Sequence, residues 1–206
     1  MRPILMRTTL TAVLAGVALF CATALFAGKY VTIVFEAEEA TNVMGKVWFV
    51  KKHGEDPGGK ASGKTLAVPK TEPGQKPKHE EVTYTVNIPQ NGYYYLWARV
   101  YWKNGCGNSV YFKIDGEKGD AILGGDGTYN ALHWVCLKET VDAKKNKTGD
   151  PLKLPLKKGT VTFVMGSKES ATEIDQFVLT TDPEMYPANS YKPTPNALVK
   201  EEKKDK

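Results

Sequence analysis

Apolar and polar residues alternate most regularly between residues 81 and 116, where three strand-like runs follow one another. Residues 81–88 and 109–114 alternate with a period of two, as half-buried strands do. Residues 93–102 are largely apolar or aromatic on both faces, which predicts a central strand. Clusters rich in Gly, Asn and Pro separate the runs and predict turns. The stretch therefore predicts three antiparallel strands of an all-β domain.

Further strand candidates flank this stretch, and the pattern predicts no amphipathic helix. They lie at residues 31–38, 47–50, 131–137, 160–165 and 173–181. About eight strands with turn signals between them are typical of a β-sandwich. We expect one such domain, spanning residues 28–187.

Residues 1–27 differ from the rest of the chain. Two arginines precede an apolar run at residues 10–26 that contains no acid, which is the pattern of a secretory signal peptide. Residues 22–24, Ala-Thr-Ala, supply a cleavage pattern. The run is also just long enough to remain as a membrane anchor. Lipidation at Cys21 is disfavoured, because the bulky Phe20 precedes it.

The formal net charge of +5 falls to +3 once the leader, with its two arginines and no acid, is removed. Lysine then supplies nearly all positive charge, and Arg99 is the one remaining arginine. Nucleic-acid binders usually use arginine for bidentate contacts, so we expect no nucleic-acid partner. Residues 188–206 are rich in proline and then in charge, and they predict a disordered, lysine-rich tail.

Cys106 and Cys136 are the two cysteines of the mature chain. An exported protein with two cysteines often pairs them. The alternative is a small buried hydrophobe at Cys136 and an incidental turn residue at Cys106. The sequence leaves both open, because it does not show the distance between the two backbones.

Residues 58–65, GGKASGKT, match the phosphate-binding P-loop pattern. That loop works only between a buried strand and a helix whose N-terminus holds the phosphates. Here a polar segment precedes the motif, and Pro69 and Pro73 follow it. We therefore expect no nucleotide.

Glu36 and Glu38 share one face of the strand predicted at residues 31–38, about 7 Å apart. Like charges so placed repel each other unless water or a cation lies between them. The alternative is an exposed strand end with two solvated acids.

Several segments together resemble carbohydrate-binding modules of families 6 and 35, which are galactose-binding-like jelly rolls. The matching segments are FEAEEA, GGKASGK, YTVNIPQNGYYYLWARV, GNSVYFKIDG, HWV, LPLKKGTVTFVM and EIDQFVLTTDPEMYP. Their order and spacing match over nearly all of residues 31–187. The resemblance implies an all-β jelly-roll sandwich of about eight antiparallel strands that binds a polysaccharide or other glycan.

The resemblance also implies a structural calcium ion. The first and third residues of the E-A-E segment and an aspartate of the last strand hold it in such modules, which are Glu36, Glu38 and Asp175 here. A hard cation prefers several oxygen ligands and would relieve the repulsion between the two glutamates.

The sugar-binding residues implied by the resemblance are aromatic rings that stack on pyranose faces and polar groups that bind hydroxyls. The matching positions are Tyr129, Trp134, Trp102, Asn108 and His133. Trp134 could equally belong to the core. An asparagine that some relatives place before the last-strand aspartate is absent, since Glu173 and Ile174 stand there.

We therefore expect a non-catalytic carbohydrate-binding module, secreted or held at the cell surface, that contacts a membrane only if the leader is retained. The alternative is a structural or adhesive surface protein that uses the same sandwich for self-association or cell-wall attachment. His53, His79 and His133 lack metal-ligand spacing, and no serine lies in a nucleophile elbow. We expect no enzymatic activity.

Overall fold

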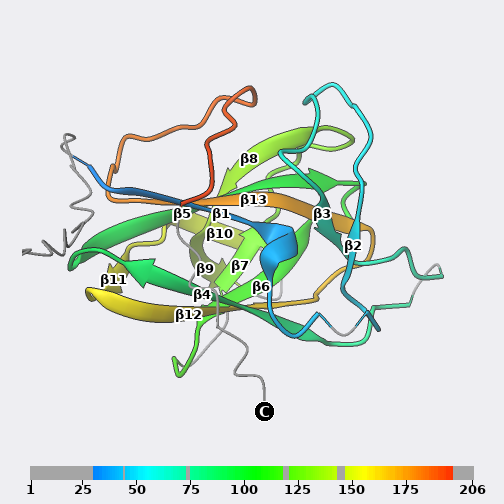
Figure 1. Cartoon of the computed structure of the whole chain (residues 1–206). Helices are drawn as coiled ribbons and strands as arrows, with labels where there is room; N and C mark the ends of the chain where they lie inside the picture. The colour runs from blue at the N-terminus through cyan, green and yellow to red at the C-terminus, as the bar shows by residue number, and fades with distance from the viewer. Residues whose placement is uncertain (1–29, 44, 73–74, 118–120, 143–146, 197–206) are drawn as a thin grey trace, which may run out of the picture.

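Two antiparallel β-sheets pack face to face in the computed structural model, which describes residues 30–43, 45–72, 75–117, 121–142 and 147–196. Figure 1 shows the sheets as two layers, with β5 and β13 in one and β4 and β12 in the other. The predicted all-β sandwich is confirmed. The predicted leader, residues 1–27, lies outside the described residues.

The described residues form more strands than the eight predicted. They are β1 (Thr32–Glu36), β2 (Phe49–Lys51), β3 (Thr65–Ala67), β4 (Glu81–Ile88), β5 (Gly92–Trp102), β6 (Ser109–Ile114), β7 (Ala121–Gly124), β8 (Leu132–Cys136), β9 (Lys138–Asp142), β10 (Lys147–Pro151), β11 (Leu154–Leu156), β12 (Gly159–Gly166) and β13 (Thr172–Thr180). The five additional strands are β3, β7, β9, β10 and β11, which have three to five residues each. They were expected to be loops, because so few residues show no clear alternation.

Strands β5 and β13 form the centre of a seven-stranded sheet. The other edge of β13 pairs with β1 and with β3, and β2 follows β3. The other edge of β5 pairs with β8 and β11. The central position predicted for residues 93–102 is confirmed. The second sheet has six strands in the order β10-β9-β7-β6-β12-β4.

The core between the sheets contains a cluster of aromatic rings that contact one another. Phe35 of β1 lies 4.9 Å from Phe177 of β13 and 5.4 Å from Tyr84 of β4, measured between ring centroids. The Tyr84 hydroxyl donates a hydrogen bond to the Ala37 carbonyl, so its polar atom is satisfied inside the core. Burial of these rings joins the first strand, the last strand and the second sheet.

The first strand is shorter than predicted. It ends at Glu36, and a 3₁₀ helix, η1 (Ala37–Glu39), follows it. Glu38 therefore does not share a strand face with Glu36, because the period of two ends at Glu36. Both side chains nevertheless point toward the same loop, residues 60–64.

A C-terminal segment, residues 182–196, covers part of the outer face of the seven-stranded sheet, the face turned away from the other sheet (Figure 1). Tyr191 packs on Trp134, and the Trp134 indole N–H donates to the Tyr191 carbonyl at 3.3 Å. Asn196 bonds to the backbone of Val34 twice, through its own N–H and its side-chain oxygen.

The prediction of a disordered tail is therefore wrong for residues 188–196, while residues 197–206 lie outside the described residues. Composition favoured disorder, but the segment gains an apolar surface and an unpaired strand edge on which to dock. It thereby caps the free edge of β1, which would otherwise be open to pairing with another chain.

The two cysteines are both free, Cys106 exposed and Cys136 buried, so the pairing considered above is not formed. Cys136 lies opposite Trp97 in the β5–β8 pair, whereas Cys106 follows the far end of β5 at Trp102. Five residues of strand separate the two positions, a span of about 16 Å, which no disulfide bridges. Burial raises the pKa of the Cys136 thiol to about 12.

Within the described residues, no helix is long and apolar enough to cross a bilayer.

Shortening the chain to end at Pro187 should lower the free energy of unfolding by about 2–4 kcal/mol, because Trp134 loses its cover and β1 loses its edge partner. Tryptophan emission of the folded protein should shift to the red. A chain ending at Asn196 is the control, since it keeps every contact described above. Unchanged emission and urea midpoint for the shorter chain would show that the segment does not dock.

Candidate functional site

The outer face of the seven-stranded sheet carries a buried ion pair at its centre. Arg99 of β5 and Asp175 of β13 are both fully buried, and their Nη1 and Oδ2 atoms lie 2.7 Å apart. The β13 register shifts between Ile174 and Gln176, so Asp175 is the extra residue of a bulge. Bulges re-aim side chains, and this one turns Asp175 toward the guanidinium.

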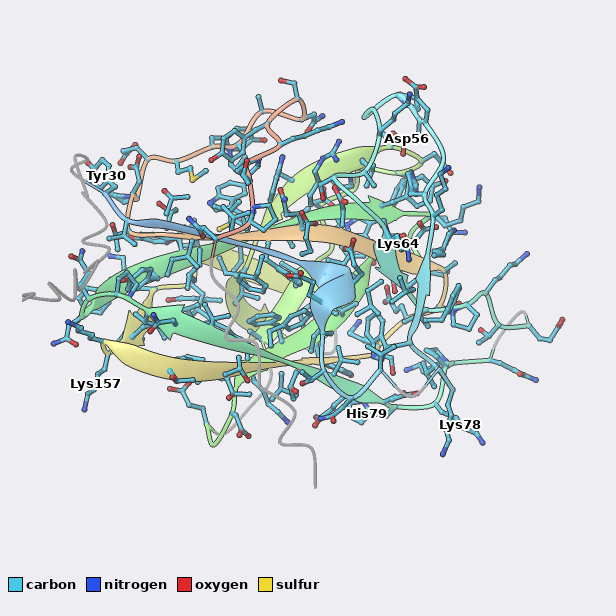
Figure 2. The ribbon with its side chains drawn as sticks, in the orientation of Figure 1. Tyr30, Asp56, Lys64, Lys78, His79 and Lys157 are labelled. Carbon is cyan, nitrogen blue, oxygen red and sulfur yellow. The ribbon has the colours of Figure 1, made fainter. Side chains whose placement is uncertain are left out.

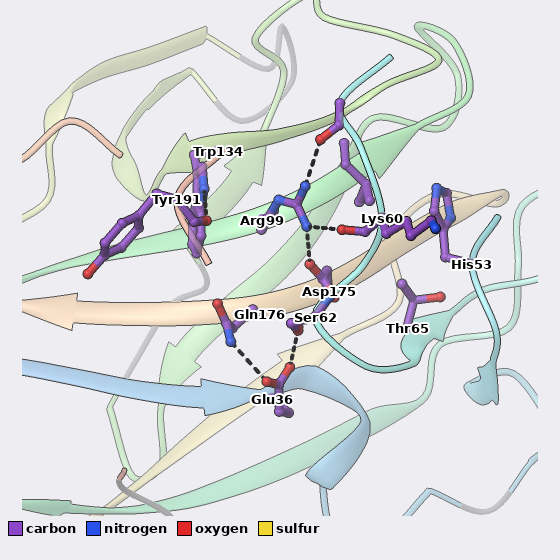
Figure 3. Close-up of polar contacts among 12 residues, drawn as sticks. Glu36, His53, Lys60, Ser62, Thr65, Arg99, Trp134, Asp175, Gln176 and Tyr191 are labelled. Atoms are coloured by element: carbon purple, nitrogen blue, oxygen red, sulfur yellow. Dashed lines mark hydrogen bonds and ion pairs between the residues drawn. The ribbon is translucent and has the colours of Figure 1, made fainter. Parts of the chain in front are cut away.

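The loop at residues 58–64 closes over this ion pair, as Figure 3 shows. The Arg99 guanidinium donates to the Lys60 carbonyl at 2.9 Å and to the Gly58 carbonyl at 2.8 Å. The P-loop-like sequence thus presents carbonyl oxygens to a cation. A true P-loop has the opposite polarity, because it presents backbone N–H groups to phosphate. Strand β3, and no helix, follows it.

Close packing fixes the loop to the neighbouring strand β8. A Cβ atom on Gly58 would lie 1.9 Å from the Leu132 carbonyl oxygen, so no other residue fits there without movement. Asp56 accepts hydrogen bonds from the backbone N–H groups of Gly58 and Leu132. The loop is therefore fixed both by its hydrogen bonds to Arg99 and by its contacts with β8.

The three predicted calcium ligands gather around this loop. The Ser62 hydroxyl lies 2.6 Å from Glu36 Oε2 and 3.0 Å from Asp175 Oδ1. The Lys64 N–H donates to Glu38 at 2.7 Å. The Ser62 hydroxyl has one proton, which cannot serve both carboxylates at once. The Ser62 N–H also donates to Asp175 Oδ1, and the Gln176 side chain donates to Glu36 Oε1. These donors are neutral, so three carboxylates share the charge of Arg99 alone among the described ion pairs.

Electrostatics agree with that deficit. Burial is the largest cause that raises the pKa of Glu36 and of Glu38, and repulsion from Asp175 adds to it. Arg99 offsets the charge of Asp175 alone. The second oxygen of Glu38, Oε2, is buried without a hydrogen-bond partner among the described residues.

These residues fit a hard cation by their chemistry. Every available donor atom is an oxygen, and calcium prefers oxygen ligands. The described residues contain no group of three or more His, Cys, Asp or Glu side chains already arranged around a metal position. A cation would thus have to draw the Glu36, Glu38 and Asp175 carboxylates closer together.

A second network lies beside the ion pair, around His53. Its ring nitrogens lie 2.8 Å from Glu173 and 3.0 Å from Asp56. The hydrogen bond to Glu173 is the main cause that raises the pKa of His53. Burial alone would raise the pKa of Glu173, but hydrogen bonds from His53 and Lys51 outweigh it and lower that pKa. His53 thus ties the loop to β13.

A groove of about 320 Å³ opens at the end of the same face. Four cross-strand partners form one row across it: Tyr101 of β5, Glu173 of β13, Ala67 of β3 and Phe49 of β2. Paired residues of neighbouring strands point to the same face, so the two rings stand at the ends of the row with small Ala67 between them. Three strand spacings separate their backbones, about 14 Å.

Of the predicted sugar-binding residues, Tyr129 is the exposed one, at 38%. Its hydroxyl lies 3.5 Å from the side-chain nitrogen of Asn108, which is buried. His133 is also buried, and its Nε2 lies 2.7 Å from Asp126. The structure therefore brings Tyr129 and Asn108 together, while the buried His133 ring lies against the Asp126 carboxylate.

The two predicted tryptophans do not line an open site. Trp102 is fully buried in the core between the sheets, which corrects its assignment to ligand contact. Trp134 is 6% exposed, because Tyr191 of the C-terminal segment covers it. The alternation of β5 places the Trp102 ring on the inner face of the sheet, and the ring is therefore a core residue.

Sequence reasoning missed Phe49 and Tyr101. Both lie in runs that were recognised as strands, but their meeting depends on the pairing of β2, β3, β13 and β5, which are far apart in the chain. Only the register of those strands places the two rings in one row.

No protein-family model and no curated protein matches this sequence. Among solved structures, a C-terminal family 6 carbohydrate-binding module of a laminarinase from Zobellia galactanivorans matches with 15% identity and a TM-score of 0.45, covering 73% of this chain and 99% of that one. A family 6 module of a Cellvibrio mixtus lichenase, solved with cellotriose, has 19% identity and a TM-score of 0.44 over 72% of this chain and 95% of that one. A family 35 module from Clostridium thermocellum has 12% identity and a TM-score of 0.44, covering 72% of this chain and 97% of that one.

These structures belong to the same two families as the sequence resemblance. At such identities and TM-scores, they carry no conclusion about what this chain binds.

Replacing Arg99 by Met should lower the free energy of unfolding by about 3–5 kcal/mol, because Asp175 and two loop carbonyls lose their buried donor. Urea unfolding in chelator measures it. Lys113→Gln, which removes a partly exposed partner of Glu81, is the control and should cost about 1 kcal/mol or less. Equal costs for the two variants would contradict a structural role for the buried pair.

Proposed function

We propose that this chain is a secreted, non-catalytic carbohydrate-binding module that holds a glycan in the groove between Phe49 and Tyr101. The observation that carries the proposal is the row of two aromatic rings across four paired strands. Aromatic faces stack on the apolar faces of sugar rings, and a few polar groups then fix orientation.

The groove suits recognition because its floor is rigid. Ala67 and Glu173 lie in paired strands, and the ring of Tyr101 packs against His53 at 5.1 Å between centroids. Side chains that are already fixed in the free protein lose little conformational entropy when a ligand binds. The volume of about 320 Å³ lies at the lower end of the range for small-molecule sites.

Tyr129, which lies beside the buried Asn108, supplies a second contact for a longer glycan. The Tyr129 hydroxyl lies near Gly105, two residues along the chain from Lys103, which lines the groove. Two residues span at most about 7 Å. A glycan chain that leaves the groove past Lys103 would therefore reach Tyr129.

The proposal of export rests on the leader pattern at residues 1–27. The proposal that the module is non-catalytic rests on how its acidic and histidine side chains are used. His53 and Glu173 bond to each other, and Asp175 is neutralised by Arg99. Groups committed to such partners hold the loop and β13 in place.

A glycan array should detect specific binding by the chain from residue 28 onward, and calorimetry on a hit should show about a tenfold or greater loss of affinity for Phe49→Ala and for Tyr101→Ala. The loss follows from removal of a stacking face.

Tyr93→Ala is the matched control, because Tyr93 is 65% exposed on the same strand but outside the groove. Tyr129→Ala should weaken long glycans more than short ones. An array without any hit would sink the proposal and favour the structural or adhesive alternative, with the assembly state as the next measurement.

We also propose a structural calcium ion held by Glu36, Glu38 and Asp175. Its support is the surplus of carboxylates around residues 60–64 and the Glu38 oxygen that has no hydrogen-bond partner among the described residues. When bound, the ion would supply the positive charge that the cluster lacks and would join β1, η1 and β13.

Calcium at millimolar concentration should raise the melting temperature by about 3–6 °C at pH 7.5, and chelator should reverse the rise. The raised pKa values of Glu36 and Glu38 mean that, without calcium, stability is lost as pH rises through them. The calcium effect should therefore shrink toward pH 4.5, where protons relieve the same repulsion.

Glu38→Gln should abolish the calcium-dependent shift, while Glu81→Gln, on the other sheet, should leave it intact. If neither calcium nor chelator changes the melting temperature at pH 7.5, the proposed ion is wrong, and the proposed glycan site is unaffected.

A further inference from the structure

We propose that the ligand of the Phe49–Tyr101 groove is an acidic glycan, a polysaccharide whose sugar units carry a carboxylate or a sulfate. This inference rests on the function proposed above and names the ligand class of the same site. It comes from the charged groups that line the groove.

Three lysines, Lys51, Lys70 and Lys103, line the groove together with a single acid, Glu173. The charge of Glu173 is already matched. Its carboxylate lies 2.7 Å from Lys51 Nζ and 2.8 Å from His53 Nδ1. The wall therefore presents a surplus of positive charge to whatever lies between the two rings.

Lys70 and Lys103 carry that surplus. Both are exposed, and neither forms an ion pair within the described residues. Lys70 follows β3, Lys103 follows β5, and β13 runs between those strands. The two ammonium groups thus flank the groove from both sides. An anion bound between them need not displace any protein carboxylate.

The combination of features selects the ligand. A neutral sugar would use the two rings and leave both ammonium groups without a partner. A free inorganic anion would use the ammonium groups and leave the rings unused. An acidic sugar chain uses both, because its rings have apolar faces and its anionic groups project from the ring edges.

The choice of lysine over arginine fits a ligand with spaced single charges. Lysine offers a compact point charge, whereas arginine offers a planar fork for bidentate phosphate or base contacts. The lining contains no arginine.

Figure 2 provides the control positions. Lys157 lies at the end of the sandwich away from Lys64 and Asp56, and it follows β11 rather than any strand of the groove. Lys157 and Lys158 are both exposed. Replacing these two lysines removes the same charge as replacing Lys70 and Lys103, so the net charge of the two double variants is equal.

The test titrates the chain from residue 28 onward with an oligogalacturonate and with its methyl ester, the same sugar backbone without charge. We expect the acidic oligomer to bind about tenfold or more tightly than the ester at 50 mM salt, and the difference to narrow at 300 mM salt as charges are screened. The double variant Lys70→Gln/Lys103→Gln should lose that preference, while Lys157→Gln/Lys158→Gln should keep it.

A sulfated and an unsulfated dextran form the second arm. Preference for the sulfated polymer alone, lost in the Lys70/Lys103 variant, would identify sulfate as the anionic group. Binding of neutral and acidic oligomers with equal affinity, sensitive to Phe49→Ala, would overturn the charge inference and leave the proposed function standing. Absence of binding to every glycan in both arms would overturn the acidic-glycan inference, and the glycan array alone would then decide the proposed function.

Discussion

A buried guanidinium sets the constraints on the outer face of this sandwich. Arg99 lies in the central strand, out of reach of water, and a charge in that position is tolerated only when it is paired and hydrogen-bonded. Asp175 supplies the countercharge, and the carbonyls of Gly58 and Lys60 accept from the guanidinium. The bulge in β13 and the close approach of Gly58 to Leu132 both serve this arrangement. The conformation of residues 58–64 is thus set by the hydrogen bonds that the buried Arg99 guanidinium requires.

Charge is divided unevenly around that pair. On one side, Glu36 and Glu38 are left with raised pKa values, and Oε2 of Glu38 has no hydrogen-bond partner among the described residues. On the other side, neither Lys70 nor Lys103 forms an ion pair within the described residues. Arg99 and Asp175 neutralise each other between them, so the two surpluses stay separate. An external cation suits the first surplus, and an anionic ligand suits the second. Both proposals therefore follow from one uneven distribution of charge on a single sheet face.

The sequence predicted the parts of the structure that depend on local pattern. The runs at residues 81–88, 93–102 and 109–114 became β4, β5 and β6 because their periodicity reflects burial within each strand. The family resemblance, and not the local pattern, grouped Glu36, Glu38 and Asp175. The structure places all three beside residues 60–64, although the first strand ends before Glu38. The groove could not be predicted in this way, because the Phe49–Ala67–Glu173–Tyr101 row depends on register between distant segments. Composition misjudged residues 188–196, since disorder is decided by the surface a segment meets as well as by its own residues.

The groove is the part of the outer face that the C-terminal segment and residues 58–64 leave uncovered. The aromatic side chains of β5 on that face run from Tyr93 through Trp97 to Tyr101. The C-terminal segment packs over the cluster that contains Trp97, and residues 58–64 cover Arg99. Tyr101 lies beyond both covers and keeps His53 at its side as a brace. Under the proposed function, ligand contact would be confined to the part of the sheet that neither segment covers. The strand that looked aromatic on both faces is therefore covered over most of its length, and Tyr101 at one end is the part that the proposed glycan site uses.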